Sequence, residues 1–89
     1  MAEDAASYKK MLTDLIKKQM VILGPNIALD KARKVAGLTV DDSGEVKDMD
    51  GDPHMVLKGV ANEYMMLSGQ IAQMTLNTLL EKYPGVESI

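Results

Sequence analysis

Three aspartates at alternate positions, Asp48, Asp50 and Asp52, come closest to the residue types and spacing of a metal site. Carboxylates at the first, third and fifth positions of a loop are typical of calcium-binding loops, which also need glycine at the sixth position and glutamate at the twelfth. Here Pro53 and Gly59 occupy those two positions. We therefore interpret the segment as a polar turn followed by a helix cap. Weak cation binding by the aspartates is the alternative.

The residues needed for catalysis are sparse in this chain. It contains one histidine, His54, and no cysteine. One imidazole cannot build a zinc site without further ligands, and no serine or threonine is arranged with it as a triad. The lack of cysteine excludes thiolate ligands and a cysteine nucleophile. We therefore predict a protein that is not an enzyme and that holds no cofactor.

Basic side chains concentrate in the first part of the chain. Residues 1–37 carry a net charge of +3 and residues 38–89 a net charge of −6, which gives −3 for the whole chain. This overall acidity argues against nucleic-acid binding. A basic patch would instead dock an acidic protein partner, and a solvated helix face is the alternative. The candidate partner surface comprises Lys17, Lys18, Lys31, Arg33 and Lys34.

Apolar spacing and helix-ending residues predict two helices and a hairpin before the final element. The first helix is expected over about 4–23, because Gly24-Pro25 then stops it. A second, shorter helix is expected over about 25–36, with Gly37 just after its end. Residues 38–49 contain two short apolar runs around turn-forming residues at 41–44, which predicts a β-hairpin.

The final element is predicted to be one long helix over about 53–83. Asp52 and Pro53 form an N-cap followed by proline at the first helical position, and the next proline is Pro84. Its apolar residues form more than one stripe, and such helices are normally buried on more than one side. The predicted self-association residues are Val56, Val60, Tyr64, Leu67, Ile71 and Met74 on one side, and Met65, Leu76 and Leu79 on another.

These stripes favour a homodimer or higher oligomer, in which the long helices pair and complete a helical bundle. The alternative is a helix that breaks near Gly69 and folds back, which would give a compact four-helix monomer. The fold class is therefore predicted to be mainly α with a small β-hairpin, in the order α-α-β-β-α.

Length and composition set the remaining expectations. A chain of 89 residues accommodates a single domain over 1–89. No signal peptide or membrane-spanning run is visible, and cysteine is absent, so we expect a cytoplasmic protein without membrane insertion. Three tyrosines are the only aromatic residues, whereas the eight methionines suit an adaptable surface.

The segment ILGPNIAL and the long final helix are similar to small helical regulatory domains of prokaryotic signalling proteins. No diagnostic motif accompanies this likeness, so no functional residue follows from it. The sequence therefore predicts a non-enzymatic, self-associating protein-interaction or regulatory module. A sensor that binds a small apolar ligand inside a helical bundle is the alternative.

Overall fold

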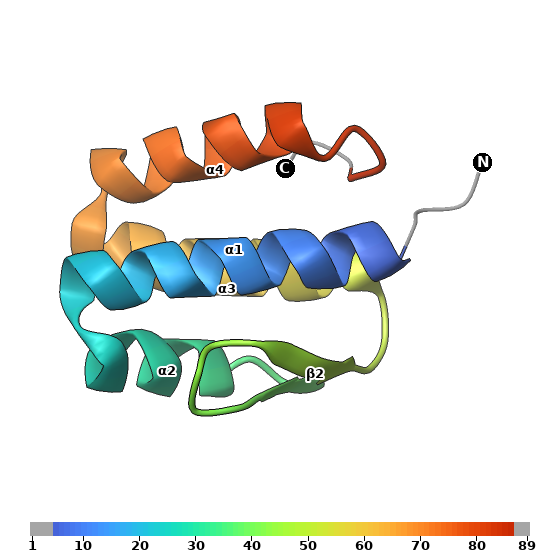
Figure 1. Cartoon of the computed structure of the whole chain (residues 1–89), viewed down its shortest axis with the longest axis horizontal. Coiled ribbons are helices and arrows are strands. Elements are labelled where there is room, and N and C mark those ends of the chain that lie inside the picture. The colour runs from blue at the N-terminus through green and yellow to red at the C-terminus, as the bar shows by residue number, and fades with distance from the viewer. Residues whose placement is uncertain (1–4, 87–89) are drawn as a thin grey trace.

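The computed structural model describes residues 5–86, which form four helices and one antiparallel hairpin. In Figure 1, α1 crosses the middle of the molecule in front of α3, with α4 on one side and α2 and the hairpin on the other. The elements in chain order are α1 (Ala5–Leu23), α2 (Pro25–Arg33), β1 (Leu38–Val40), β2 (Val46–Met49), α3 (Pro53–Ser68) and α4 (Gln70–Lys82). The prediction of a mainly helical chain with a small hairpin is confirmed.

The first two helices meet at Gly24, whose positive φ of 91° turns the chain, and Pro25 begins α2. The second helix ends at Arg33, earlier than the predicted boundary near residue 36. Tight turns follow, in which the amides of Lys34 and Val35 donate to carbonyls three residues earlier. Gly37, with φ of 85°, then directs the chain into β1.

The hairpin is attached to the helices at both of its edges. Along β2, the Val46 amide donates to Thr13 Oγ1 on α1 at 3.0 Å. Along β1, the Arg33 guanidinium on α2 donates to the Val40 carbonyl at 2.9 Å. Because unpaired strand edges are templates for pairing with another chain, these two contacts direct the hairpin inward instead of toward a second sheet.

The turn of the hairpin is organised by Asp41. Its Oδ1 accepts hydrogen bonds from the Ser43 hydroxyl at 2.7 Å and from the amides of Ser43 and Glu45 at 2.9 and 3.0 Å. These donors stabilise the carboxylate and, led by the Ser43 hydroxyl, lower the pKa of Asp41 to about 2. The Asp41 carboxylate therefore remains charged throughout the physiological pH range.

The prediction of one helix over 53–83 is wrong, because α3 ends at Ser68 and α4 begins at Gln70. Gly69 between them has φ of 50° and ψ of −115°, a conformation that favours glycine. After this break, α4 folds back and packs against α1 and α3 (Figure 1). The packing buries Ala72, Leu76 and Leu79, so the apolar side of α4 is covered within the chain itself.

The core lies around α1, which contacts α2, α3, α4 and β2. Tyr64 of α3 is fully buried, and its hydroxyl donates to the Ala28 carbonyl of α2 at 2.8 Å. This burial raises the pKa of Tyr64. The fully buried apolar residues of α1 are Tyr8, Met11, Leu12, Leu15 and Ile16.

The polar side chain of Gln19 is also fully buried, beside Ser68 at the end of α3. Among the helices within residues 5–86, none has both the length and the apolar character needed to cross a membrane.

Candidate interaction surfaces

The predicted self-association residues separate into a buried and an exposed group. The buried group belongs to the core of the chain, so these residues are not available to a second copy in this conformation; it comprises Val56, Val60, Tyr64, Leu76 and Leu79. Met65 is half-buried against the same core. Leu67, Ile71 and Met74 are exposed. The first stripe is therefore buried up to Tyr64 and exposed from Leu67 onward, whereas the second stripe is buried or half-buried throughout.

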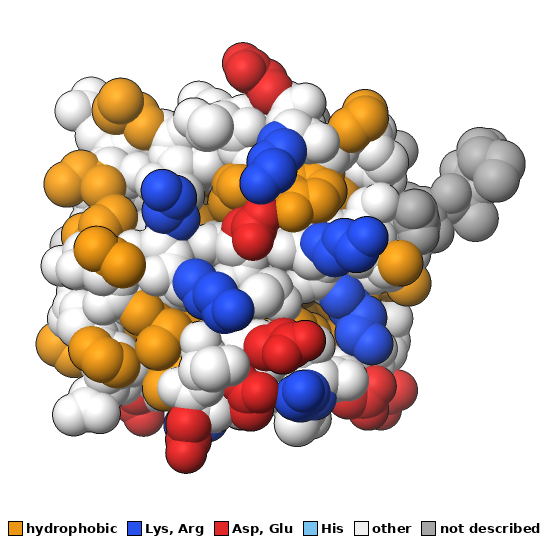
Figure 2. All heavy atoms as spheres, in the orientation of Figure 1, with side chains coloured by type: hydrophobic (Ala, Val, Ile, Leu, Met, Phe, Trp, Pro, Cys, Tyr) orange, Lys and Arg blue, Asp and Glu red, His pale blue; other side chains and the backbone are white. Residues whose placement is uncertain are grey.

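The exposed residues belong to a larger apolar surface at one end of the molecule. In Figure 1 this is the end where α1 finishes, α2 begins and α3 meets α4. In Figure 2 hydrophobic side chains gather along the same end. We call this surface the apolar end; it comprises Val21, Ile22, Ile27, Met66, Leu67, Ile71 and Met74. Val21, Ile22, Ile27 and Met66 were missed by the sequence reasoning.

The two segments that form the apolar end carry no charged residue. No Asp, Glu, Lys or Arg occurs in residues 19–29 or in residues 64–80, and all the residues of the apolar end lie in these two segments. The fold brings the two segments together, because α1 ends where α3 turns into α4. These uncharged runs are the sequence signal that could have located the surface.

A shallow groove of about 440 Å³ between α1 and α4 forms part of this end. Val21 and Ile22 line it from α1, and Met74 and Leu79 line it from α4. Its rim is polar but mostly uncharged, because Thr75 and Thr78 lie beside a single lysine, Lys18.

The exposure of this surface is large for so small a chain. Val21 is 85% exposed, Met66 77% and Met74 68%. Single exposed apolar side chains are normal on a protein surface, whereas a group of them gathered in one place generally marks an interaction site.

The predicted basic surface is divided between two helices. Lys17 and Lys18 are exposed on α1. Arg33 at the end of α2 is engaged with the hairpin, because it also pairs with Asp42 at 3.1 Å. Lys31 on α2 and Lys34 just after it form no ion pair within residues 5–86. Figure 2 shows that lysine and arginine side chains are spread over the face on which α1 lies, with acidic groups among them.

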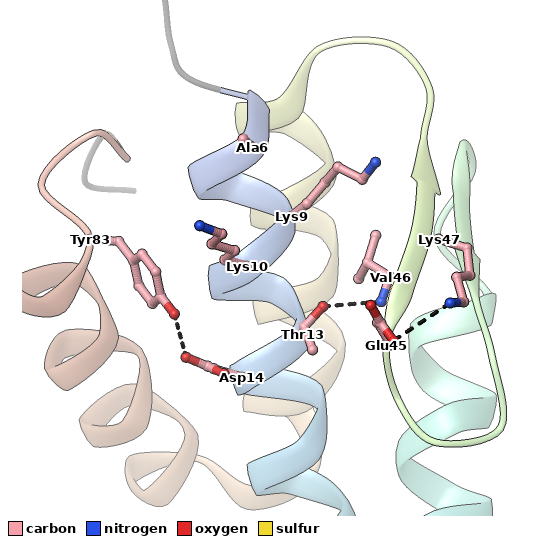
Figure 3. A pocket seen from close by; sticks show the side chains of 9 residues that line it. All are labelled: Ala6, Lys9, Lys10, Thr13, Asp14, Glu45, Val46, Lys47 and Tyr83. Carbon is pink, nitrogen blue, oxygen red and sulfur yellow. Dashed lines mark hydrogen bonds and ion pairs between the residues drawn. The ribbon is translucent and has the colours of Figure 1, made fainter.

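A second groove, of about 470 Å³, lies beside α1 and is shown in Figure 3. Lys9 and Lys10 line it together with Asp14 and Tyr83. The Tyr83 hydroxyl donates to Asp14 at 2.6 Å, and this hydrogen bond raises the pKa of Tyr83. Lys82 pairs with the same carboxylate at 3.4 Å. Asp14 therefore joins α1 to the end of α4 and has a structural role.

The aspartates considered as metal ligands have separate local roles. The Asp52 carboxylate caps α3 by accepting from the His54 amide at 3.0 Å. The Asp48 carboxylate accepts from the amide of Met49 at 3.0 Å, and the Asp50 amide donates to the Gly37 carbonyl. Across residues 5–86, no three His, Asp or Glu side chains are grouped closely enough to hold a metal ion.

The fold is thus that of a small four-helix domain with an attached hairpin, and the apolar end is its most distinctive surface. Comparison with known protein families, curated proteins and solved structures finds no match to this chain.

Proposed function

We propose that this protein is a non-enzymatic, self-associating interaction module, in which the apolar end binds the same surface of a second copy. The observation that carries the proposal is the joining of two uncharged segments, 19–29 and 64–80, into one exposed apolar surface. Leaving this surface in water is unfavourable, and covering it gains about 25 cal/mol for each Å² removed from water.

A second copy suits this surface for two reasons. In a symmetric dimer each patch meets itself, so a charged patch would repel its own copy, whereas an uncharged one does not. In addition, a symmetric contact removes the exposed apolar side chains of both copies from water at once. The hairpin is less suited to self-association, since Thr13 and Arg33 occupy its edges.

Charge placed in the apolar end tests the proposal. We expect Val21→Glu and Met74→Glu each to weaken self-association at least about a hundredfold, because the symmetric contact would bury a carboxylate from both copies without partners. Sedimentation equilibrium over a range of protein concentrations measures the dissociation constant.

Met55→Glu is the matched control. Met55 is 60% exposed, but it lies in the first turn of α3, at the other end of that helix from Gly69. Self-association of this variant should change less than about twofold. A wild-type chain that remains monomeric at millimolar concentration, or equal losses in all three variants, would contradict the proposal.

We also infer that the lysines of α1 select an acidic protein partner. Charge complementarity acts mainly on the association rate, so reversal of Lys17 and Lys18 to glutamate should slow partner capture roughly tenfold at low salt. Capture from lysate, followed at two salt concentrations, measures the effect. Lys58→Glu, an exposed lysine on α3, is the control. Undiminished capture by the double variant would refute this assignment.

The groove between α1 and α4 supports a second candidate function, a sensor of a small apolar ligand. Its volume of about 440 Å³ falls within the usual range for ligand pockets, and Val21, Ile22 and Met74 provide apolar walls. Native mass spectrometry of the purified chain distinguishes the two functions. A copurifying small molecule that Met74→Glu displaces favours the sensor, whereas dimers without added mass favour self-association.

A further inference from the structure

We propose that two copies of this chain associate by exchanging α4. In the exchanged dimer, α3 and α4 of each copy join into one continuous helix, and each α4 packs on the α1 and α3 of the other copy. This inference rests on the proposed function, because it specifies how the copies meet at the apolar end.

Within residues 5–86, two helix junctions share one hydrogen-bond pattern. At the first, the Gly24 amide donates to the Met20 carbonyl at 3.0 Å, and the Gly24 carbonyl accepts from the Ala28 amide at 3.1 Å. At the second, Gly69 makes the equivalent bonds, to Met65 at 3.0 Å and from Gln73 at 3.1 Å. Each glycine thus ends one helix and begins the next with four-residue spacing on both sides.

The two junctions differ in the residue that follows the glycine. Pro25 follows Gly24, and proline inside a helix lacks the amide hydrogen and clashes with the preceding turn. The α1–α2 junction therefore cannot straighten. Gln70 follows Gly69, and glutamine is a good helix former. At the α3–α4 junction only the conformation of one glycine separates the bent form from a straight helix.

Straightening would satisfy backbone groups that the bend leaves open. The amides at the start of α4 have no intrahelical acceptor, and no side chain within residues 5–86 caps them. In a continuous helix they would donate to the carbonyls at the end of α3. The buried contacts of Ala72, Leu76 and Leu79 would be kept, because the second copy offers the same α1 surface.

The apolar end would lie where the two straightened helices cross. Met66, Leu67, Ile71 and Met74 flank Gly69 on both sides, and no charged residue occurs in 64–80. The symmetry axis of an exchanged dimer passes near the junction, so these side chains would be buried between the two copies without like-charge repulsion.

A natural ion pair reports directly on the exchange. Lys82 at the end of α4 lies 3.4 Å from Asp14 on α1. A carbodiimide activates the Asp14 carboxylate, and attack by the Lys82 amine then forms an amide and releases the corresponding urea. When equal amounts of ¹⁴N- and ¹⁵N-labelled chains are refolded together, this cross-link joins peptides of the same label in the bent form. In the exchanged dimer it also joins peptides of different label.

Two neighbouring substitutions should move the equilibrium in opposite directions. Gly69→Ala disfavours the bend through backbone conformation alone, because an added Cβ meets nothing within 4 Å, and alanine favours the straight helix. We expect the dimer association constant to rise roughly thirtyfold. Gln70→Pro reproduces the Gly-Pro order of the first junction and should abolish exchange.

The proposal is supported if the wild-type dimer yields Asp14–Lys82 cross-links between peptides of different label. These mixed cross-links should be more abundant in Gly69→Ala and absent in Gln70→Pro. If light scattering finds dimers whose cross-links always join the same label, exchange is refuted while self-association stands. If neither the wild type nor Gly69→Ala dimerises, both proposals are refuted. Circular dichroism verifies that each variant is folded, and if Gly69→Ala is not, the wild type and Gln70→Pro decide the result.

Discussion

Replacing Tyr64 with alanine is expected to remove about 3–5 kcal/mol from the free energy of unfolding, the largest effect of any single substitution considered for this chain. The ring is fully buried at the contact between α3 and α2, and its loss leaves a cavity that surrounding side chains fill only in part. Small domains have a total stability of only about 5–15 kcal/mol, so the variant should be close to unfolding at room temperature.

The matched variant Tyr64→Phe separates the ring from its hydroxyl. It keeps the packing and removes only the 2.8 Å hydrogen bond to the Ala28 carbonyl, which should cost about 1 kcal/mol. Urea denaturation followed by far-ultraviolet circular dichroism measures both free energies. If the two variants lose equal stability, the hydroxyl dominates, and the ring-packing explanation is wrong.

Replacing Gly37 with alanine should cost about 3 kcal/mol, the second largest expected effect. Gly37 has φ of 85°, and a Cβ at this position would lie 2.5 Å from the backbone oxygen of Asp50. The two residues close the base of the hairpin, where the Asp50 amide donates to the Gly37 carbonyl at 2.7 Å. Because the obstacle is backbone, it cannot move aside without breaking this closure.

Gly51→Ala provides the control for backbone conformation without a clash. Gly51 has φ of 87°, close to the value at Gly37, but a Cβ there meets no atom within 4 Å. Its cost should therefore be only about 1 kcal/mol. Thermal unfolding of the two variants side by side gives the difference, and equal midpoints would show that the contact with Asp50 does not restrict this position.

The core and the apolar end differ in how well the sequence located them. Tyr64, Val56 and Val60 were correctly seen as apolar positions to be covered, but their cover is the same chain and not a second copy. Periodicity reports which side of a helix is apolar, and it carries no information about which surface will cover that side. Ile22 follows the apolar spacing of the first predicted helix, yet it remains outside the core because α1 extends past its neighbours at that end.

The two glycines of residues 53–83 show the same limit of prediction from local sequence. Gly59 and Gly69 both interrupt a helical pattern, and local propensity treats them alike. Gly59 stays inside α3, where an added Cβ would lie 3.2 Å from a methyl group of Val35, so its small size permits close packing. Gly69 has no such neighbour, because an added Cβ there meets nothing within 4 Å, and the chain turns back at this residue. Which glycine breaks the helix depends on these distant contacts.

The sequence by itself determined the features that depend on neighbouring residues: the end of α1 at Gly24-Pro25, the capping of α3 by Asp52 and the turn of the hairpin. These follow from fixed dihedral angles and local hydrogen bonds. Only the tertiary structure decided that α4 folds back and that two uncharged segments meet at one end. Such outcomes depend on the burial of apolar surface between segments far apart in the chain, and local patterns do not encode that pairing.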